Sequence, residues 1–187
     1  MGQKPVLGIT MGDATGSGPE IIAKSLANRS FYDIARPVVI GDAGIMRRAA
    51  EIVQAGLTVR AVKTVSEGGG NPDVIDVLDL KNLPPDLPFA KVDARAGKAA
   101  YEYVAKAVEL ATADVIDAIV TAPLHKEAMN LGGYHYAGHT EILAQLSGTK
   151  NYAMMLVGGP LRVIHVSTHV SLREAYERVK KERVLQV

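Results

Sequence analysis

Short apolar runs alternate with helix-like segments along the N-terminal third of the chain, and this alternation constrains the fold more than any other feature. The predicted strands are Val6–Thr10, residues 36–42 and residues 57–62, and the predicted helices are residues 21–26 and 43–55. A β-α-β-α-β order with short connections is typical of a parallel sheet with helices on its faces. The sequence therefore predicts an α/β fold.

The first predicted strand runs into a glycine-rich loop, GDATGSGPE at residues 12–20. Ser17 and Glu20 match a capping box, and Pro19 would lie in the first turn of the next helix. The spacing Gly-x-x-x-Gly-x-Gly matches neither the dinucleotide fingerprint nor the P-loop. Two interpretations stay open: a loop that binds phosphate at a helix N-terminus, or a tight turn whose glycines supply positive φ.

The rest of the chain continues the pattern less regularly. Residues 74–78 and 117–120 predict strands, and residues 95–111 predict a long helix whose core stripe is Ala99, Tyr103, Ala107 and Leu110. Residues 152–157 and 161–167 flank Gly158-Gly159-Pro160, which predicts a β-hairpin and hence a mixed sheet. Residues 172–187 predict one final helix. We therefore expect a mostly parallel sheet with some antiparallel strands.

Polar, protonatable side chains are concentrated just beyond the strand predicted at residues 117–120. The segments VTAPLHKEA (120–128) and YHYAGHTE (134–141) contain Lys126, His139 and Thr140 among them. Parallel strands deliver their carboxyl ends to the crevice where α/β sheets bind ligands, so these residues form a candidate site. His139 and Thr140 would lie in the first turn of a helix, a position that suits an anionic substrate.

Two more histidines, His165 and His169, follow the second strand of the predicted hairpin. Four strand positions span about 13 Å, at about 3.3 Å each, which is too far for both imidazoles to bind one metal ion. His169 lies at the strand exit and is the better candidate ligand, whereas His165 is expected to be a partly buried sheet histidine. One histidine cannot hold a metal alone, and the sequence shows no clear second or third ligand.

Composition narrows the chemistry and the partners. The 187 residues, 48% hydrophobic and 22% charged, are typical of a folded globular protein, and a net charge of +1 gives no footprint for nucleic acid or an acidic membrane. The absence of cysteine excludes thiolate zinc sites and cysteine nucleophiles. No signal-peptide pattern and no apolar run of about 18 residues is present, so we expect a cytoplasmic protein.

Four blocks of the sequence, in order, carry a resemblance to a known family. They are ITMGDATGSGPE (9–20), VTAPLHK (120–126), GHTE (138–141) and VSTH (166–169). Together they resemble the 4-hydroxythreonine-4-phosphate dehydrogenase family of pyridoxine and pyridoxal phosphate biosynthesis, which includes D-erythronate and D-threonate 4-phosphate dehydrogenase relatives. The resemblance implies an isocitrate/isopropylmalate dehydrogenase-like fold and a homodimer with its active site near the subunit interface.

The resemblance also implies an activity and residue roles. The activity is the metal-dependent NAD or NADP oxidation, with decarboxylation, of a phosphorylated four-carbon hydroxy acid such as 4-phosphohydroxy-L-threonine. His139 and Thr140 would bind substrate, His169 would bind the divalent ion (Zn, Mg, Co or Mn), and Lys126 would assist proton transfer if it is buried. The resemblance assigns no cofactor-binding residue in this chain.

The chain departs from the family pattern in two ways. Family members are longer, so residues 1–187 are expected to be a single α/β region, the N-terminal and central part of a two-lobed dehydrogenase that is inactive without its second half. Ala14-Thr15 and Ser17 replace residues more usual in the vitamin pathway, which favours the D-erythronate/D-threonate alternative. Alternatives of another class are a catalytically inactive fragment and a phosphate-binding transferase.

Overall fold

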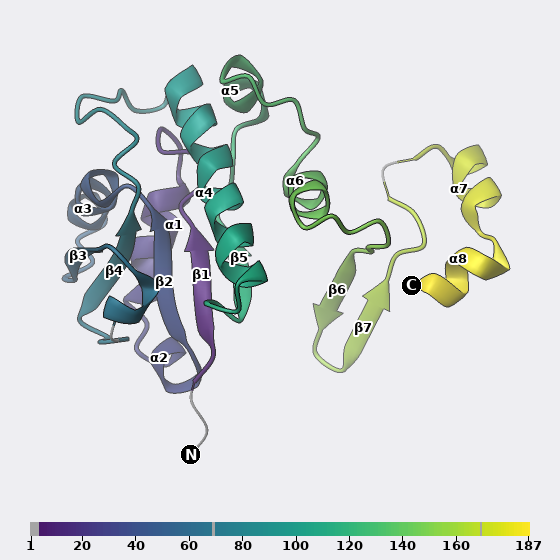
Figure 1. Cartoon of the computed structure of the whole chain (residues 1–187), viewed down its shortest axis with the longest axis horizontal. Helices are drawn as coiled ribbons and strands as arrows, with labels where there is room; N and C mark the ends of the chain where they lie inside the picture. The colour runs from purple at the N-terminus through teal and green to yellow at the C-terminus, as the bar shows by residue number, and fades with distance from the viewer. Residues whose placement is uncertain (1–3, 69, 169) are drawn as a thin grey trace. The chain divides into compact units, whose positions relative to one another are not determined.

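The computed structural model describes residues 4–68, 70–168 and 170–187 of the chain (Figure 1). It divides into two compact units, Met1–Ser147 and Gly148–Val187. That both units belong to one α/β region of a longer dehydrogenase stays a prediction.

The first unit is built on a five-stranded sheet in the order β3-β4-β2-β1-β5, and every pairing in it is parallel. The strands are β1 (Val6–Thr10), β2 (Arg36–Gly41), β3 (Thr58–Val62), β4 (Val74–Asp79) and β5 (Ala118–Thr121). All five match strands predicted from the apolar runs, to within a residue or two at each end. The α/β fold class is therefore confirmed.

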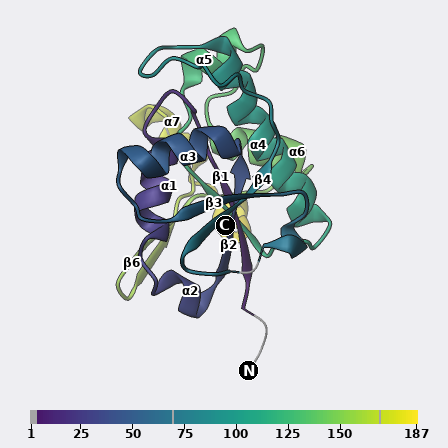
Figure 2. The same cartoon turned by 90° about the vertical axis from the view of Figure 1, so that its left-hand side faces the viewer.

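Helices cover both faces of this sheet. They are α1 (Gly18–Leu26), α2 (Phe31–Ile34), α3 (Ala43–Ile52), α4 (Ala94–Thr112), α5 (Lys126–Leu131) and α6 (His139–Leu146), with a 3-10 turn, η1 (Val65–Glu67). Figure 2 shows α1 and α3 on one side of the sheet and α4 and α6 on the other. In addition, α4 contacts α5, α6 and strands β1, β2 and β5.

The core lies where the central strand meets these helices. Val38, Val39 and Ile40 of β2 are fully buried, as a parallel strand covered on both faces must be. Tyr103 of α4 is also fully buried, and its hydroxyl donates a hydrogen bond of 2.9 Å to Asn82 Oδ1. A buried tyrosine hydroxyl needs such a partner, because leaving it without one would cost free energy of folding.

Helix starts in the first unit differ in one respect from the sequence-based expectation. The capping box predicted at Ser17 and Glu20 does not form: Ser17 is the N-cap of α1 but has helical φ and ψ, and its hydroxyl accepts no capping bond. Asp42 caps α3 through a 3.0 Å bond from the Ile45 amide, and Asp93 caps α4 through a 2.8 Å bond from the Arg95 amide. An N-cap side chain reaches the first-turn amides from extended backbone, which Asp42 and Asp93 have and Ser17 lacks.

The second unit contains the predicted hairpin. Strands β6 (Met155–Gly158) and β7 (Leu161–Ile164) pair antiparallel across Gly159 and Pro160. The antiparallel strands are thus confirmed, but they form a sheet of their own and do not make the parallel sheet mixed.

The final helix predicted over residues 172–187 is two helices, α7 (Leu172–Arg178) and α8 (Lys181–Gln186). The helix is interrupted at Val179, whose ψ of 81° is not helical. Arg183 of α8 donates hydrogen bonds to the carbonyl oxygens of Val166 (3.2 Å) and Tyr152 (3.1 Å). None of the helices in the described residues combines the length and the apolar character of a membrane span.

Candidate functional site

The candidate site of the first unit begins where β1 and β5 end side by side. Thr10 and Thr121 are register partners at the carboxyl ends of these strands. Beyond them the two loops stay in contact, because the Ala122 amide donates to Thr10 O (3.1 Å) and the Asp13 amide donates to Pro123 O (2.9 Å). The glycine loop and the VTAPLHK segment therefore lie against each other at the carboxyl edge of the sheet, where α/β folds bind ligands.

The glycines of the first loop are explained by this close approach. Gly12 has φ of +71°, and a Cβ there would overlap the carbonyl oxygen of Pro123. A Cβ at Gly18 would lie 2.6 Å from Met11 O. Both positions thus need glycine for backbone packing, which favours the tight-turn interpretation over a phosphate-binding loop.

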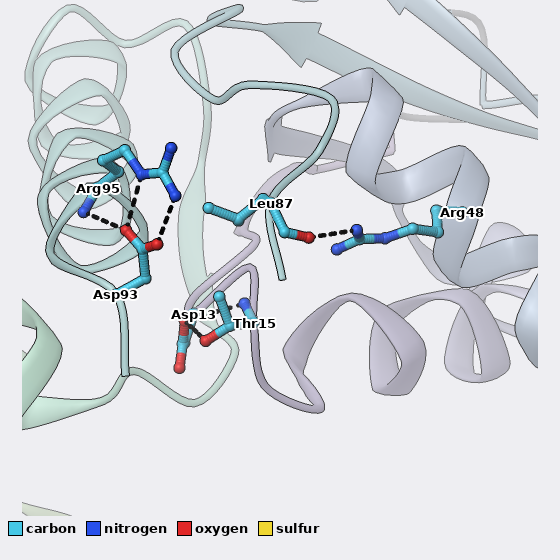
Figure 3. A network of polar contacts seen from close by, with 6 residues as sticks. All are labelled: Asp13, Thr15, Arg48, Leu87, Asp93 and Arg95. Atoms are coloured by element: carbon cyan, nitrogen blue, oxygen red, sulfur yellow. Dashed lines mark hydrogen bonds and ion pairs between the residues drawn. The ribbon is translucent and has the colours of Figure 1, made fainter. Parts of the chain in front are cut away.

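A buried carboxylate shapes the same loop. Asp13 Oδ1 accepts hydrogen bonds from the Thr15 amide (3.0 Å) and the Thr15 hydroxyl (2.9 Å), as Figure 3 shows. The Thr15 carbonyl oxygen in turn accepts from the Ala90 amide at 2.9 Å. The loop between β4 and α4 (residues 80–93) is thereby attached to the glycine loop.

Arg48 of α3 also contacts the β4–α4 loop, at Leu87 (Figure 3). Its Nη1 donates to Leu87 O at 2.8 Å, and its guanidinium carbon lies 3.7 Å from the ring centre of Phe89. Within the described part of the chain, Arg48 Nε and Nη2 are buried without a hydrogen-bond partner. Sequence reasoning missed Arg48, because nothing in its local pattern shows which loop it will meet.

Lys126 is the first residue of α5. The helix is capped by His125, whose Nδ1 accepts a 3.3 Å hydrogen bond from the Ala128 amide. Nδ1 must therefore carry no proton, so a neutral His125 has its proton on Nε2. Lys126 itself is exposed, so the burial on which its predicted role depends would have to come from a group outside the described residues.

His139 and Thr140 open α6, as the sequence predicted. The N-cap is Gly138, which offers no capping side chain, and Glu141 instead accepts a 2.7 Å bond from the Ala137 amide. Thr140 is exposed and His139 is half-buried. Burial lowers the pKa of the His139 imidazole below its ordinary value, so the ring is neutral at neutral pH.

His139 has an unsatisfied ring nitrogen. Among residues 4–68, 70–168 and 170–187, no group hydrogen-bonds its buried Nε2. A buried polar atom without a partner costs free energy unless a ligand or water satisfies it. The nitrogen can serve either as donor or as acceptor, because a neutral imidazole exists in both tautomers.

The predicted metal ligand His169 lies outside the described residues, so its placement stays a prediction. His165 is partly buried directly after β7, and its amide donates to Met154 O at 3.0 Å. The strand ends at Ile164, so the strand spacing used to separate His165 from His169 does not apply. No three His, Asp or Glu side chains in the described part of the chain are grouped as a metal site.

Comparison with known proteins finds one family over most of the chain. Residues 33–187 match the family described as pyridoxal phosphate biosynthetic protein PdxA. A D-threonate 4-phosphate dehydrogenase of Cupriavidus necator is 49% identical over 176 residues, which cover 94% of this chain and 53% of that protein. The chain therefore spans about half the length of this curated relative.

Solved structures show the same relationship. The crystal structure of a 4-hydroxythreonine-4-phosphate dehydrogenase from Burkholderia phymatum matches with a TM-score of 0.94 and 49% identity, covering 98% of this chain and 56% of that one. The corresponding enzyme from Klebsiella pneumoniae matches with a TM-score of 0.91 and 39% identity, covering 99% of this chain and 56% of that one.

Proposed function

Because the chain belongs to the family of pyridoxal phosphate biosynthetic protein PdxA, we propose that it works as part of an NAD(P)-dependent oxidoreductase acting on a phosphorylated four-carbon hydroxy acid. The family match confirms the family that the four sequence blocks predicted. The observation that carries the proposal is His139 at the start of α6, neutral, half-buried and with Nε2 unsatisfied within the described residues. A substrate oxygen would satisfy this nitrogen.

The substrate is one of two closely related phosphates. The sequence resemblance put 4-phosphohydroxy-L-threonine first, and the solved relatives carry that enzyme's name. The curated relative from Cupriavidus necator is named for D-threonate 4-phosphate, and the residues at Ala14-Thr15 and Ser17 favour the sugar-acid substrates too. Both compounds pair a hydroxyl group with a phosphate, so the same α6 site would suit either.

The roles of the chain's own residues follow from their positions. The first-turn amides of α6 have no side-chain cap, and the N-terminus of a helix favours negative charge. Thr140 offers an exposed hydroxyl beside them. His139 stays uncharged at neutral pH, so it orients substrate by a hydrogen bond and does not repel a neighbouring cation. NAD or NADP, when bound, accepts the hydride.

The proposal also includes a divalent ion and Lys126. The described residues do not by themselves fit such an ion, because they offer no group of three ligands. His169 would then need further ligands from beyond the described residues or from a second copy of the protein. Lys126 is kept as a candidate for proton transfer, and the homodimer and the cytoplasmic location belong to the proposal as well.

The test uses the full-length gene product with a divalent ion present. We expect reduction of NAD or NADP with D-threonate 4-phosphate or 4-phosphohydroxy-L-threonine, followed by nicotinamide absorbance. His139→Ala should lower kcat/KM by about 10²-fold or more, because misplacing a substrate costs that much. The matched control is His135→Ala, because His135 is an exposed histidine in the loop just before α6.

The outcomes separate the alternatives. Turnover that falls with His139→Ala and not with His135→Ala supports the proposal. Phosphate binding without any thermal stabilisation by NAD or NADP would support the transferase alternative. A full-length protein that turns over neither substrate would support an inactive protein and overturn the proposed function.

A further inference from the structure

Helix α4 presents two different faces. Ala96, Ala99, Tyr103 and Ala107 are buried in the main core with the sheet. Gly97, Tyr101 and Val104 follow each other at helical spacing on another face, and Val104 packs in a separate cluster with Met129 of α5 and Ile142 of α6. The helix therefore supports both elements that carry the candidate site residues Lys126 and His139.

Tyr101 is the part of this face that reaches the loop before His139. Its ring stacks on Tyr134 with centroids 3.7 Å apart at 14°, and on Tyr136 with centroids 5.7 Å apart at 15°. Tyr134 and Tyr136 belong to the loop between α5 and α6. Stacked aromatic pairs have a preferred geometry. The three stacked rings therefore define the position of this loop relative to α4.

Two hydrogen bonds also hold this loop. Tyr134 is also held by its amide, which donates to Met129 O at 3.0 Å, and Ala137 is held by Glu141 at 2.7 Å. Only Ala137 and Gly138 separate Tyr136 from His139. On the far side of His139, Ile142 is fully buried one turn along α6. His139 is thus set between two anchors, Tyr136 and Ile142, and both belong to the cluster around α4.

We propose that Tyr101 is a positioning residue for the candidate site: through its stack with Tyr134 and Tyr136 it holds His139 in the geometry that binds substrate. The proposal rests on the proposed function, because it assumes that His139 contacts substrate. Tyr101 needs no substrate contact of its own for this role. Tyr101 lies outside the core stripe predicted for this helix, and its ring packs against the loop and not against the sheet.

The first test compares two substitutions in the full-length gene product. Tyr101→Leu removes the stack and keeps an apolar side chain, and we expect kcat/KM to fall by about tenfold to a hundredfold, since small misplacements of a site are costly. Tyr101→Phe keeps the ring and should restore activity to within about threefold. Tyr103→Phe, on the sheet-facing side of the same helix, removes the Asn82 hydrogen bond and should lower the melting temperature without lowering kcat/KM.

A double-mutant cycle shows whether Tyr101 acts through His139. If it does, Tyr101→Leu combined with His139→Ala should be no more than about threefold worse than His139→Ala alone, because the positioned group is already gone. Should Tyr101→Leu fail to fold, Tyr136→Leu replaces it, since Tyr136 lies in the loop and is only partly buried. In either variant the imidazole NMR signal of His139 should shift, and that of His125 should not.

The outcomes distinguish the two proposals. If the losses of kcat/KM caused by Tyr101→Leu and by His139→Ala multiply in the double variant, Tyr101 acts independently of His139. That result would overturn the positioning role. Unchanged kcat/KM for Tyr101→Leu, or a loss that Tyr101→Phe does not restore, would overturn it too. If His139→Ala itself leaves turnover intact, the failure belongs to the proposed function, and Tyr101 then has no site to position.

Discussion

His139 concentrates the chemistry of the candidate site in a single side chain. Its half-buried ring, its lowered pKa and its unsatisfied Nε2 all indicate a neutral imidazole that lacks a hydrogen-bond partner within the described residues. Its place in a helix's first turn could be predicted from the Gly-His-Thr-Glu sequence. Its burial could not, because the local sequence does not show how α6 packs against α4.

The lowered pKa of His139 predicts a pH dependence of stability. Below its ordinary pKa of about 6.5, the histidine of the unfolded chain takes up a proton while the folded one resists it. The unfolded state then binds more protons, so the free energy of unfolding falls as pH drops through this range. Urea unfolding at pH 8 and pH 5.5 measures this change. The free energy of unfolding should fall more between the two pH values for the parent chain than for His139→Gln. Equal losses would contradict the burial of this ring.

Asp93 predicts a second effect at residue scale. Its carboxylate caps α4 and bonds the Arg95 guanidinium at 2.6 Å, and that bond lowers the pKa of Asp93 to about 2. Asp93→Ala should cost about 1 kcal/mol at pH 7 through the lost cap. Because the folded pKa is depressed, the stabilisation is present above pH ~4 and is lost as pH falls toward ~2. Chemical unfolding at several pH values measures both.

The control for this effect is Asp93→Asn, which keeps an acceptor oxygen for the Arg95 amide and removes the charge. Arg95 is mostly exposed, with a side-chain exposure of 54%, so the ion pair itself should be worth less than about 1 kcal/mol. Asp93→Asn should therefore lie close to the parent at pH 7. If it is as damaging as Asp93→Ala, the charge matters more than the cap.

At the scale of elements, the sequence predicts best where local pattern and packing agree. The five parallel strands and α4 appear as expected. The apolar run of β2 and the apolar stripe of α4 are also the parts that become buried. The capping box at Ser17 does not form because the backbone there has helical φ and ψ. The last predicted helix is interrupted at Val179, and Arg183 beyond the break bonds carbonyl groups distant in sequence. Neither departure could be predicted from the local pattern.

The packing of α5 on α4 is an element-scale feature that no sequence pattern reveals. A Cβ at Gly97 would overlap the Ala128 backbone of α5, and a Cβ at Gly132 would lie 2.7 Å from the Lys98 amide nitrogen of α4. Gly97→Ala should therefore destabilise the chain by about 1–3 kcal/mol through overpacking, despite the better helix propensity of alanine. Lys98→Ala, at the exposed neighbouring position, should change stability by no more than about 0.5 kcal/mol. A neutral or stabilising Gly97→Ala would contradict the close contact.

At the scale of the whole molecule, the two units differ in how much they bury. The first holds a continuous core from β3 to α4. In the second, none of the residues 148–168 and 170–187 is buried, and apolar side chains of both hairpin strands are exposed. The family resemblance predicted that function requires a second half in addition to residues 1–187. The relatives are about twice as long as this chain.

This difference predicts unequal protection from hydrogen exchange in the 187-residue chain. Amides of β2 and α4 should exchange only through global unfolding, because their hydrogen bonds lie in the core. Amides paired across β6 and β7 should exchange at least about a hundredfold faster, since few apolar contacts hold that hairpin closed. Exchange followed by NMR measures each amide, and β3 serves as a control because it is an exposed edge strand within the first unit. If the hairpin exchanges as slowly as β2, contacts beyond those of the described residues must stabilise it in this chain.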